Sequence, residues 1–191
     1  MGSGTSLALT WGSTPEEREM PFPCDALLPE ADGEYFRAVD VRAPKEVLFR
    51  WLCQLKVAPY SYDLLDNFGR RSPHRLIPGV ENLARGQKVM TIFEIVEFEK
   101  DRHLTVALSE PRAIALFGRV AMSYVVLPTS EGSCRLIAKM RVCYSRKAPW
   151  SWLRWFLPWG DLLMMRKQFL TLKHLAETEP ALRGPEGSFR T

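Results

Sequence analysis

The sequence lacks any hydrophobic run long enough to cross a membrane, and it does not begin like a secreted protein. No apolar stretch approaches the roughly 20 residues that a membrane-spanning helix needs. The segment Met1 to Thr10 has neither a basic start nor a hydrophobic centre of the kind that secretory signals carry. We therefore expect a cytoplasmic protein. Met1-Gly2 with Ser6 also fits the permissive N-myristoylation pattern, but we favour the interpretation of these residues as a flexible tail.

Cysteine and histidine are scarce and scattered, which argues against the common metal and catalytic classes. The four cysteines form no CxxC pair, and the three histidines are His74, His103 and His174. Zinc sites need such ligands at close spacing, so we expect no metal. No GxSxG, P-loop, GxGxxG or HExxH pattern occurs, so we expect no cofactor. Acid–base chemistry by other residues stays open.

Charge is unevenly distributed along a chain of otherwise ordinary composition. The 191 residues are 46% hydrophobic and 25% charged, as in a single globular domain. Residues 1–34 hold seven acidic residues and one basic residue, whereas residues 139–173 hold eight basic residues and Asp161 alone as an acid. A basic segment with interleaved aromatics indicates an anionic membrane surface, nucleic acid or an acidic ligand, unless it is simply a solvated face.

Composition also marks the ends of the expected domain. Residues 1–33 are acidic and rich in Pro, Gly and Ser, which favours an extended arm. Residues 34–178 form the domain. The polar residues 179–191 form a tail that we expect to be flexible.

The first part of the domain combines a strand with helices. Residues 35–41 alternate apolar and polar side chains, as a strand does. Pro44 then opens a helix with an apolar stripe at helical spacing. A second short helix is expected near residues 64–67, where Asp63 or Ser61 supplies a cap.

The second part is a run of strands followed by one long helical segment. Period-two alternation separated by turn residues predicts strands over 89–98, 103–109, 118–127 and 134–144. The close turns favour antiparallel pairing. After Pro149 the pattern is helical to about residue 177, and Pro158 with Gly160 predicts a kink or a division of that helix.

This element order and one short motif resemble the START-like helix-grip superfamily, also called SRPBCC. The motif lies in VDVRAPKEVLFRWL, residues 39–52, where Ala43-Pro44 and Val47 match the family's helix start and Trp51 matches with a displacement. The resemblance implies an α+β helix-grip fold. In that fold a curved antiparallel sheet wraps around a long C-terminal helix, two short helices follow the first strand, and a cavity lies between sheet and helix.

The resemblance therefore implies a mainly apolar cavity closed by the Trp-rich helix, with part of the Trp stripe inside and one or two rings exposed. Such a cavity suits a lipid, an isoprenoid or an aromatic polyketide. The residues expected to line it are Tyr62, Leu104, Val106, Leu108, Val120, Met122, Tyr124, Met140, Val142, Trp152, Trp155, Phe156 and Trp159.

The candidate acid–base groups are Tyr60, Tyr62, Asp63 and Glu94. The first three lie in the polar segment APYSYDLLDNFGRRSP, and Glu94 lies among apolar strand residues. At the cavity they would position or protonate a ligand carbonyl. The alternative is structural: Asp63 caps a helix, the tyrosines pack with polar tips outward, and Glu94 is an outward strand charge.

These observations leave three functions open. The first is non-catalytic transport or sensing of a hydrophobic small molecule, and the second is a cyclase- or dehydratase-like enzyme using the acid–base candidates above. The third is peripheral association with an anionic membrane through the basic Trp-rich helix. We expect no nucleic-acid partner, because no helix-turn-helix, RNP or finger motif is visible. The sequence does not predict an oligomeric state.

Overall fold

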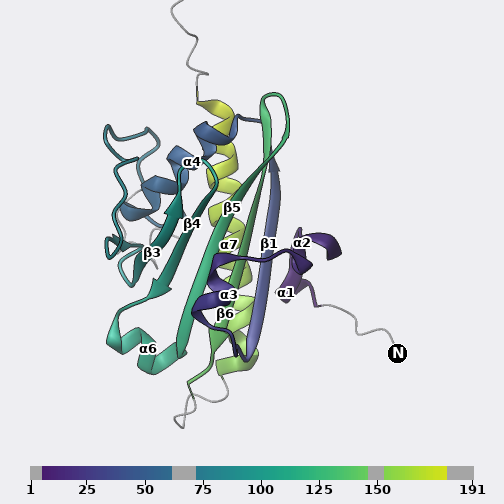
Figure 1. Cartoon of the computed structure of the whole chain (residues 1–191), viewed down its shortest axis with the longest axis vertical. Helices are drawn as coiled ribbons and strands as arrows, with labels where there is room; N and C mark the ends of the chain where they lie inside the picture. Colours follow the sequence, from purple (N-terminus) through teal and green to yellow (C-terminus); the bar gives the residue numbers. More distant parts are fainter. Residues whose placement is uncertain (1–5, 62–71, 146–152, 180–191) are drawn as a thin grey trace, which may run out of the picture.

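A single antiparallel sheet packs on a long C-terminal helix in the computed structural model of the chain (Figure 1). The structure describes residues 6–61, 72–145 and 153–179, and in these ranges the sheet has six strands in the order β1-β6-β5-β4-β3-β2. The strands are β1 (Gly33–Val41), β2 (Lys88–Val89), β3 (Phe93–Glu99), β4 (His103–Leu108), β5 (Arg119–Ser130) and β6 (Ser133–Cys143). The expected α+β helix-grip fold is confirmed.

Helices lie on both faces of this sheet. They are α1 (Leu7–Thr10), α2 (Pro15–Glu19), α3 (Pro23–Leu27), α4 (Lys45–Cys53), the 3-10 helix η1 (Gln54–Lys56), α6 (Pro111–Phe117) and α7 (Leu153–Thr178). Helices α7 and α4 pack on one face, and α3 packs on the other (Figure 1). Two of these helices carry Pro44 or Pro111 at their starts, where a missing N–H is tolerated. The second helix expected near residues 64–67 lies outside the described residues.

The alternation of side chains along the strands explains how the sheet packs against helices on both of its faces. On the face toward α7, Val106, Met122 and Leu136 are buried with Phe169 and Leu172 of the helix in the main core. The residues that alternate with them point to the other face, where a smaller core forms around the following side chains: Phe22, Cys24, Leu28, Phe36, Ala38, Ala121 and Ile137. The sheet is therefore buried on both sides in its centre.

The expectation of an extended arm over residues 1–33 is wrong for the part that the structure describes. Three short helices form there, and Thr14 and Glu17 make a reciprocal capping box at the start of α2. Phe22 and Cys24 are 3% and 0% exposed against the sheet. Proline here fixes helix starts instead of breaking structure, because Pro15 and Pro23 occupy the first turns of α2 and α3.

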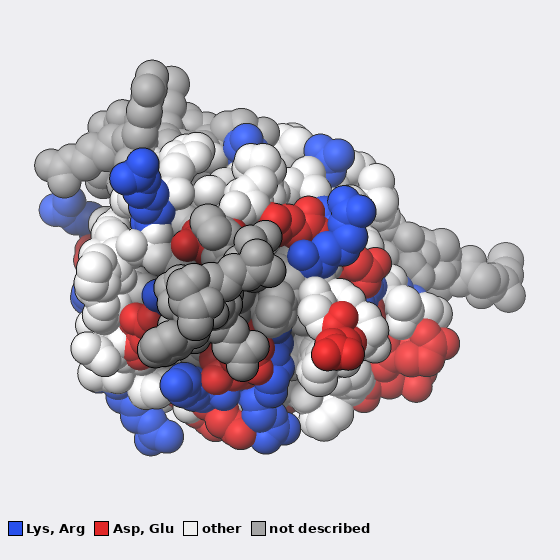
Figure 2. Space-filling view, turned by 90° about the horizontal axis from the view of Figure 1, so that it is seen from above, with Lys and Arg blue, Asp and Glu red and all other residues white. Residues whose placement is uncertain are grey.

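The uneven charge along the sequence is balanced in space, because acids of this N-terminal segment pair with bases of the sheet. Glu17 accepts from Arg135, and Asp25 lies 2.6 Å from Lys139 and 2.8 Å from Arg141. Seen from the top of Figure 1, acidic and basic side chains are interspersed over the visible surface (Figure 2). Much of the sequence's acidic and basic bias is thus used in holding the N-terminal segment to the sheet.

The C-terminal helix is not divided at Pro158 and Gly160. Helix α7 runs for 26 residues with Pro158 inside it. Proline lacks one backbone donor, but here it stands in the second turn, and its carbonyl accepts a hydrogen bond from Arg37 at 3.4 Å. No helix within the described ranges is long and apolar enough to span a membrane.

Candidate ligand-binding site

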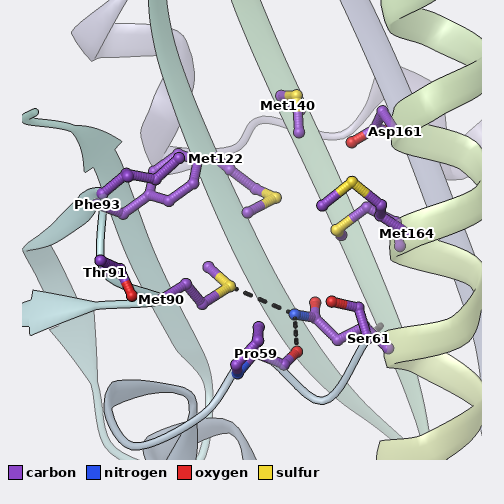
Figure 3. A pocket seen from close by; sticks show the side chains of 12 residues that line it. Pro59, Ser61, Met90, Thr91, Phe93, Met122, Met140, Asp161 and Met164 are labelled. Atoms are coloured by element: carbon purple, nitrogen blue, oxygen red, sulfur yellow. Dashed lines mark hydrogen bonds between the residues drawn. The ribbon is translucent and has the colours of Figure 1, made fainter. Parts of the chain in front are cut away.

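A cavity of about 290 Å³ lies between α7, the sheet and two connecting segments. Its walls come from five places in the chain (Figure 3). Residues Pro59 and Ser61 follow η1, Met90 to Ile92 connect β2 to β3, and Phe93 begins β3. The remaining lining residues are Met122 on β5, Met140 on β6, and Asp161, Met164, Met165 and Gln168 on α7.

Methionine dominates the cavity wall. The chain has seven methionines, and five of them line this cavity: Met90, Met122, Met140, Met164 and Met165. Methionine side chains are unbranched, polarizable and adaptable, so they fit apolar molecules of varied outline. Figure 3 shows Met90, Met122, Met140 and Met164 arranged around the space between strands and helix. The wall is therefore apolar and deformable.

Gln168 is the polar group at one end of the cavity, and its hydrogen bonds go to the protein. Its side-chain amide donates to the Pro59 carbonyl at 2.7 Å and contacts the Met90 sulfur at 3.3 Å. Its carbonyl accepts from the Tyr124 hydroxyl at 2.8 Å. Gln168 therefore ties α7 to the segment after η1 and to β5. Burial raises the pKa of Tyr124, which keeps its hydroxyl protonated as the donor.

Asp161 is the charged residue among the described residues of the cavity wall, and it is paired with Arg37 of β1. The Arg37 Nη2 lies 2.5 Å from Asp161 Oδ2. The Arg37 side chain is 1% exposed, and that of Asp161 is 12% exposed. Figure 3 shows the Asp161 carboxyl reaching from α7 toward Met140. The structure thus places a carboxylate at an apolar cavity and a buried cation behind it.

Burial determines how readily Asp161 ionises. Desolvation raises the pKa of Asp161 from its ordinary 3.8 to about 6, and the neighbouring Arg37 opposes this shift only in part. The carboxyl is also close enough to Tyr35 and Tyr124 to contribute to the raised pKa of each. A carboxyl with a pKa near neutrality, in a cavity, is a group that can accept and release a proton or bind a donor.

The cavity rim carries strained backbone. In the described ranges four residues other than glycine have positive φ. Two of them, Met90 (47°) and Thr91 (69°), line the cavity, and a third, Tyr60 (57°), lies between the lining residues Pro59 and Ser61. Positive φ is unfavourable for these side chains, and most of all for the β-branched Thr91. Such strain gathers at functional sites, where the surroundings hold it in place. It also explains why the strand expected over 89–98 is interrupted after Val89.

The strand residues expected to line the cavity all lie on the face toward α7, but only two of them reach the cavity. Met122 and Met140 line it. The others are packed in the hydrophobic clusters around it: Leu104, Val106, Leu108, Val120, Tyr124 and Val142. Side chains of α7 and of neighbouring strands fill the space in front of them.

The aromatic residues expected to close the cavity do not face it. Trp155, Phe156 and Trp159 are 69%, 64% and 54% exposed. Helical periodicity gives the reason, because Asp161, Met165 and Gln168 occupy the side of α7 that faces the sheet and the aromatic stripe falls on the other side. Trp152 and Tyr62 lie outside the described residues.

The acid–base candidates are not brought together. Tyr60 is 1% exposed. Its hydroxyl accepts a hydrogen bond from Gln54 and donates one to the Pro73 carbonyl at 2.8 Å, so it is hydrogen-bonded within the protein core. Glu94 pairs with Ala107 and alternates with Phe93 and Ile95, which places it on the sheet face opposite α7. Asp63 lies outside the described residues. The described residues contain no group of His, Cys, Asp and Glu able to hold a metal ion.

Known proteins resemble this chain in architecture. No protein-family model matches it, and no curated protein does. Norcoclaurine synthase from Thalictrum flavum matches with a TM-score of 0.49 at 11% identity, over 83% of this chain and 93% of that one. A Chromobacterium violaceum protein matches with a TM-score of 0.47 at 14% identity, over 75% and 96%. The di-domain ARO/CYC protein BexL from the BE-7585A biosynthetic pathway matches with a TM-score of 0.44 at 13% identity, over 77% of this chain and 48% of that one. These likenesses concern the fold alone and do not bear on a ligand.

Proposed function

We propose that the protein binds an apolar small molecule in the methionine-lined cavity, as a carrier or sensor. The observation that carries the proposal is a wall in which five methionines meet Ile92 and Phe93, with polar groups confined to a few points. This combination of apolar lining and a few placed polar groups is typical of small-molecule sites.

The size of the cavity favours a small ligand within the hydrophobic class. Its volume of about 290 Å³ lies just below the roughly 300–1,000 Å³ common for ligand pockets. A ring system or a short chain suits this volume better than a two-chain lipid. An isoprenoid or an aromatic compound of one or two rings is the preferred occupant.

Binding is favoured over a cyclase- or dehydratase-like reaction by the positions of the acid–base candidates. Tyr60 is engaged in the core, and Glu94 lies on the other face of the sheet. A reaction would need a second acid or base beside Asp161, and Gln168 does not titrate.

Filling the cavity from its rim should abolish ligand binding without unfolding the protein. Met164 lines the cavity and is 41% exposed, so Met164→Trp places a larger side chain at the entrance with little strain. In the unchanged protein, a neutral apolar probe such as butylbenzene should raise the unfolding free energy by about 2.7 kcal/mol at a hundred times its Kd. Thermal unfolding with and without the probe measures the effect.

The matched control is Leu163→Trp, on the neighbouring position that is 59% exposed and faces away from the cavity. This variant should keep the full response to butylbenzene, whereas Met164→Trp should lose it. An equal response in both variants, or no response in the unchanged protein, would contradict binding in this cavity.

The apolar outer stripe of α7 supports a second function. We define this stripe as Trp155, Phe156, Trp159 and Leu163, each more than half exposed. The exposed Arg166 and Lys167 lie one turn further along the helix. Indole rings beside basic groups settle at the interface of an anionic membrane. We propose peripheral membrane contact through this stripe, and because Met164 borders both stripe and cavity, the contact would bring the cavity entrance near the lipid.

Vesicle sedimentation tests this contact. Vesicles of equal phosphatidylcholine and phosphatidylserine should bind the protein at low salt and release much of it at high salt, because salt screens the attraction of the basic groups. Trp155→Ser with Trp159→Ser should remove binding, while Leu7→Ser, at a site 60% exposed and outside the stripe, should not. Self-association of the unchanged protein without vesicle binding would assign the stripe to a second copy of the chain instead.

A further inference from the structure

Two of the polar residues that line the cavity, Gln168 and Asp161, differ in whether they have hydrogen-bonding capacity left for a ligand. The side-chain amide group of Gln168 is already hydrogen-bonded to Pro59, Met90 and Tyr124. Asp161 has its Oδ2 held by Arg37, and among the described residues its other carboxylate oxygen has no hydrogen-bond partner. This oxygen can be reached from the cavity, because Asp161 lines the cavity and its side chain is 12% exposed. The cavity therefore offers a hydrogen-bond acceptor.

Arg37 cannot serve an anionic ligand in the same way. Its Nη2 donates to the Ala8 carbonyl at 2.8 Å, to the Pro158 carbonyl at 3.4 Å and to Asp161. Its Nη1 donates to the Phe36 carbonyl at 2.8 Å, and its Nε is buried without a hydrogen-bond partner among the described residues. Arg37 is not part of the cavity wall. A ligand in the cavity meets the carboxylate and not the guanidinium behind it.

We infer that the cavity selects apolar molecules that carry one hydrogen-bond donor, a hydroxyl or an amine, placed against Asp161, and that it rejects carboxylates. The inference rests on the proposed binding function and adds the ligand's polar group to it. Met140, Met164 and Met165 surround the donor end, and Ile92, Phe93 and Met122 contact the apolar body.

The selection follows from the chemistry of buried charge. A donor that reaches the free oxygen of Asp161 makes a charge-assisted hydrogen bond in apolar surroundings, which strengthens binding by about ten- to a hundredfold over the bare hydrocarbon. A ligand carboxylate would instead bring a second negative charge close to Asp161, where the described wall residues offer no cation to compensate for the hydration that it loses. Simple fatty acids are therefore excluded as ligands.

Four probes of one skeleton test the inference on the unchanged protein. They are butylbenzene, 4-phenylbutanol, 4-phenylbutylamine and 4-phenylbutyrate, titrated by calorimetry at pH 8. The alcohol and the amine should each bind about ten times more tightly than butylbenzene, and the carboxylate should bind more weakly than butylbenzene. The alcohol and amine arms also show which donor is preferred.

The outcomes separate this inference from the function on which it rests. If butylbenzene binds and neither donor improves on it, or if the carboxylate matches the alcohol, the inference is wrong while the binding function stands. If none of the four probes binds, the binding function itself fails and the inference fails with it.

A pH titration and one variant give an independent readout. The charged and titratable groups facing Asp161 are Arg37 and Tyr35 from β1 and Tyr124 from β5. Both tyrosines have raised pKa values, so Asp161 alone of these groups titrates between pH 5 and 8, with a pKa of about 6. The amine's advantage over butylbenzene should fall at least several-fold from pH 8 to pH 5, and Asp161→Asn should remove both this dependence and the rejection of the carboxylate. An amine advantage that does not change with pH would overturn the assignment to Asp161, whether or not the variant folds.

Discussion

Replacing Arg37 by methionine is expected to lower the free energy of unfolding by about 3–5 kcal/mol, because it leaves Asp161 as a buried charge without its partner. Arg37 is 1% exposed and holds Asp161 at 2.5 Å, together with backbone carbonyls of three segments. Urea unfolding followed by circular dichroism measures the loss. A double variant, Arg37→Met with Asp161→Leu, removes both charges and should recover most of it, since apolar replacement of a buried pair is often neutral or stabilising.

The control for this prediction is an exposed ion pair. Arg102 and Glu99 lie 2.8 Å apart with side chains 67% and 50% exposed, so Arg102→Met should cost less than about 1 kcal/mol. A loss of similar size in both arginine variants would contradict the special position of Arg37.

The same pair sets a pH dependence with a definite sign. The folded pKa of Asp161, about 6, lies above its ordinary 3.8, so this carboxyl favours folding most below pH 3.8 and that contribution is lost as pH rises through 6. Without Arg37 the folded pKa should rise further. The stability loss of Arg37→Met should therefore be larger at pH 8 than at pH 5, and a loss independent of pH would show that lost packing, not charge, causes it.

Phe169→Ala is expected to destabilise the protein by about 3–5 kcal/mol, because Phe169 is a fully buried contact of α7 with the sheet. Its ring lies 6.2 Å from that of Tyr124, centroid to centroid, and belongs to the main core cluster. A cavity left by the ring cannot be refilled by solvent in such apolar surroundings. Thermal unfolding should show a lowered Tm, by roughly 2–4 °C for each kcal/mol.

Trp159→Ala on the same helix provides the contrast. Trp159 is the larger side chain but is 54% exposed, so its truncation should change the free energy of unfolding by no more than about 0.5 kcal/mol. If Trp159→Ala were as damaging as Phe169→Ala, the outer stripe would be part of the core after all, and membrane contact through it would lose its basis.

Much of the fold could be predicted because strand alternation is a local signal. In β6 the residues Leu136, Ala138 and Met140 repeat with period two, and the structure places them toward α7 as expected. Tight turns between the strands then restrict pairing to antiparallel neighbours. The short helix α6 was not predicted, because a segment of seven residues between two strands has the pattern of an ordinary connecting loop.

The site could be predicted less well because it depends on which side of a helix faces inward. Apolar residues lie on more than one side of α7, so the sequence allows two faces to pack on the sheet. The prediction that the aromatic face does so is wrong. A better signal was present in Asp161, the single acid of a basic segment, and in Arg37, which shares the sheet face of Tyr35 by its spacing of two. One acid and one base, each on an apolar surface that faces the other, form a pattern that predicts an ion pair between Asp161 and Arg37.

The N-terminal helices have a consequence for where the smallest autonomous unit of this protein begins. The Ala8 carbonyl supports Arg37, the Trp11 carbonyl accepts from the Ala38 amide at 3.0 Å, and a side chain at Gly12 would collide with the Ala38 carbonyl oxygen. A fragment cut at residue 34, where composition changes, would lose these contacts and uncover Phe36 on the far side of the sheet. Truncation boundaries and fusion partners therefore belong ahead of Leu7, since Arg37, which pairs with Asp161 of the cavity wall, is itself held by the Ala8 carbonyl ahead of the first strand.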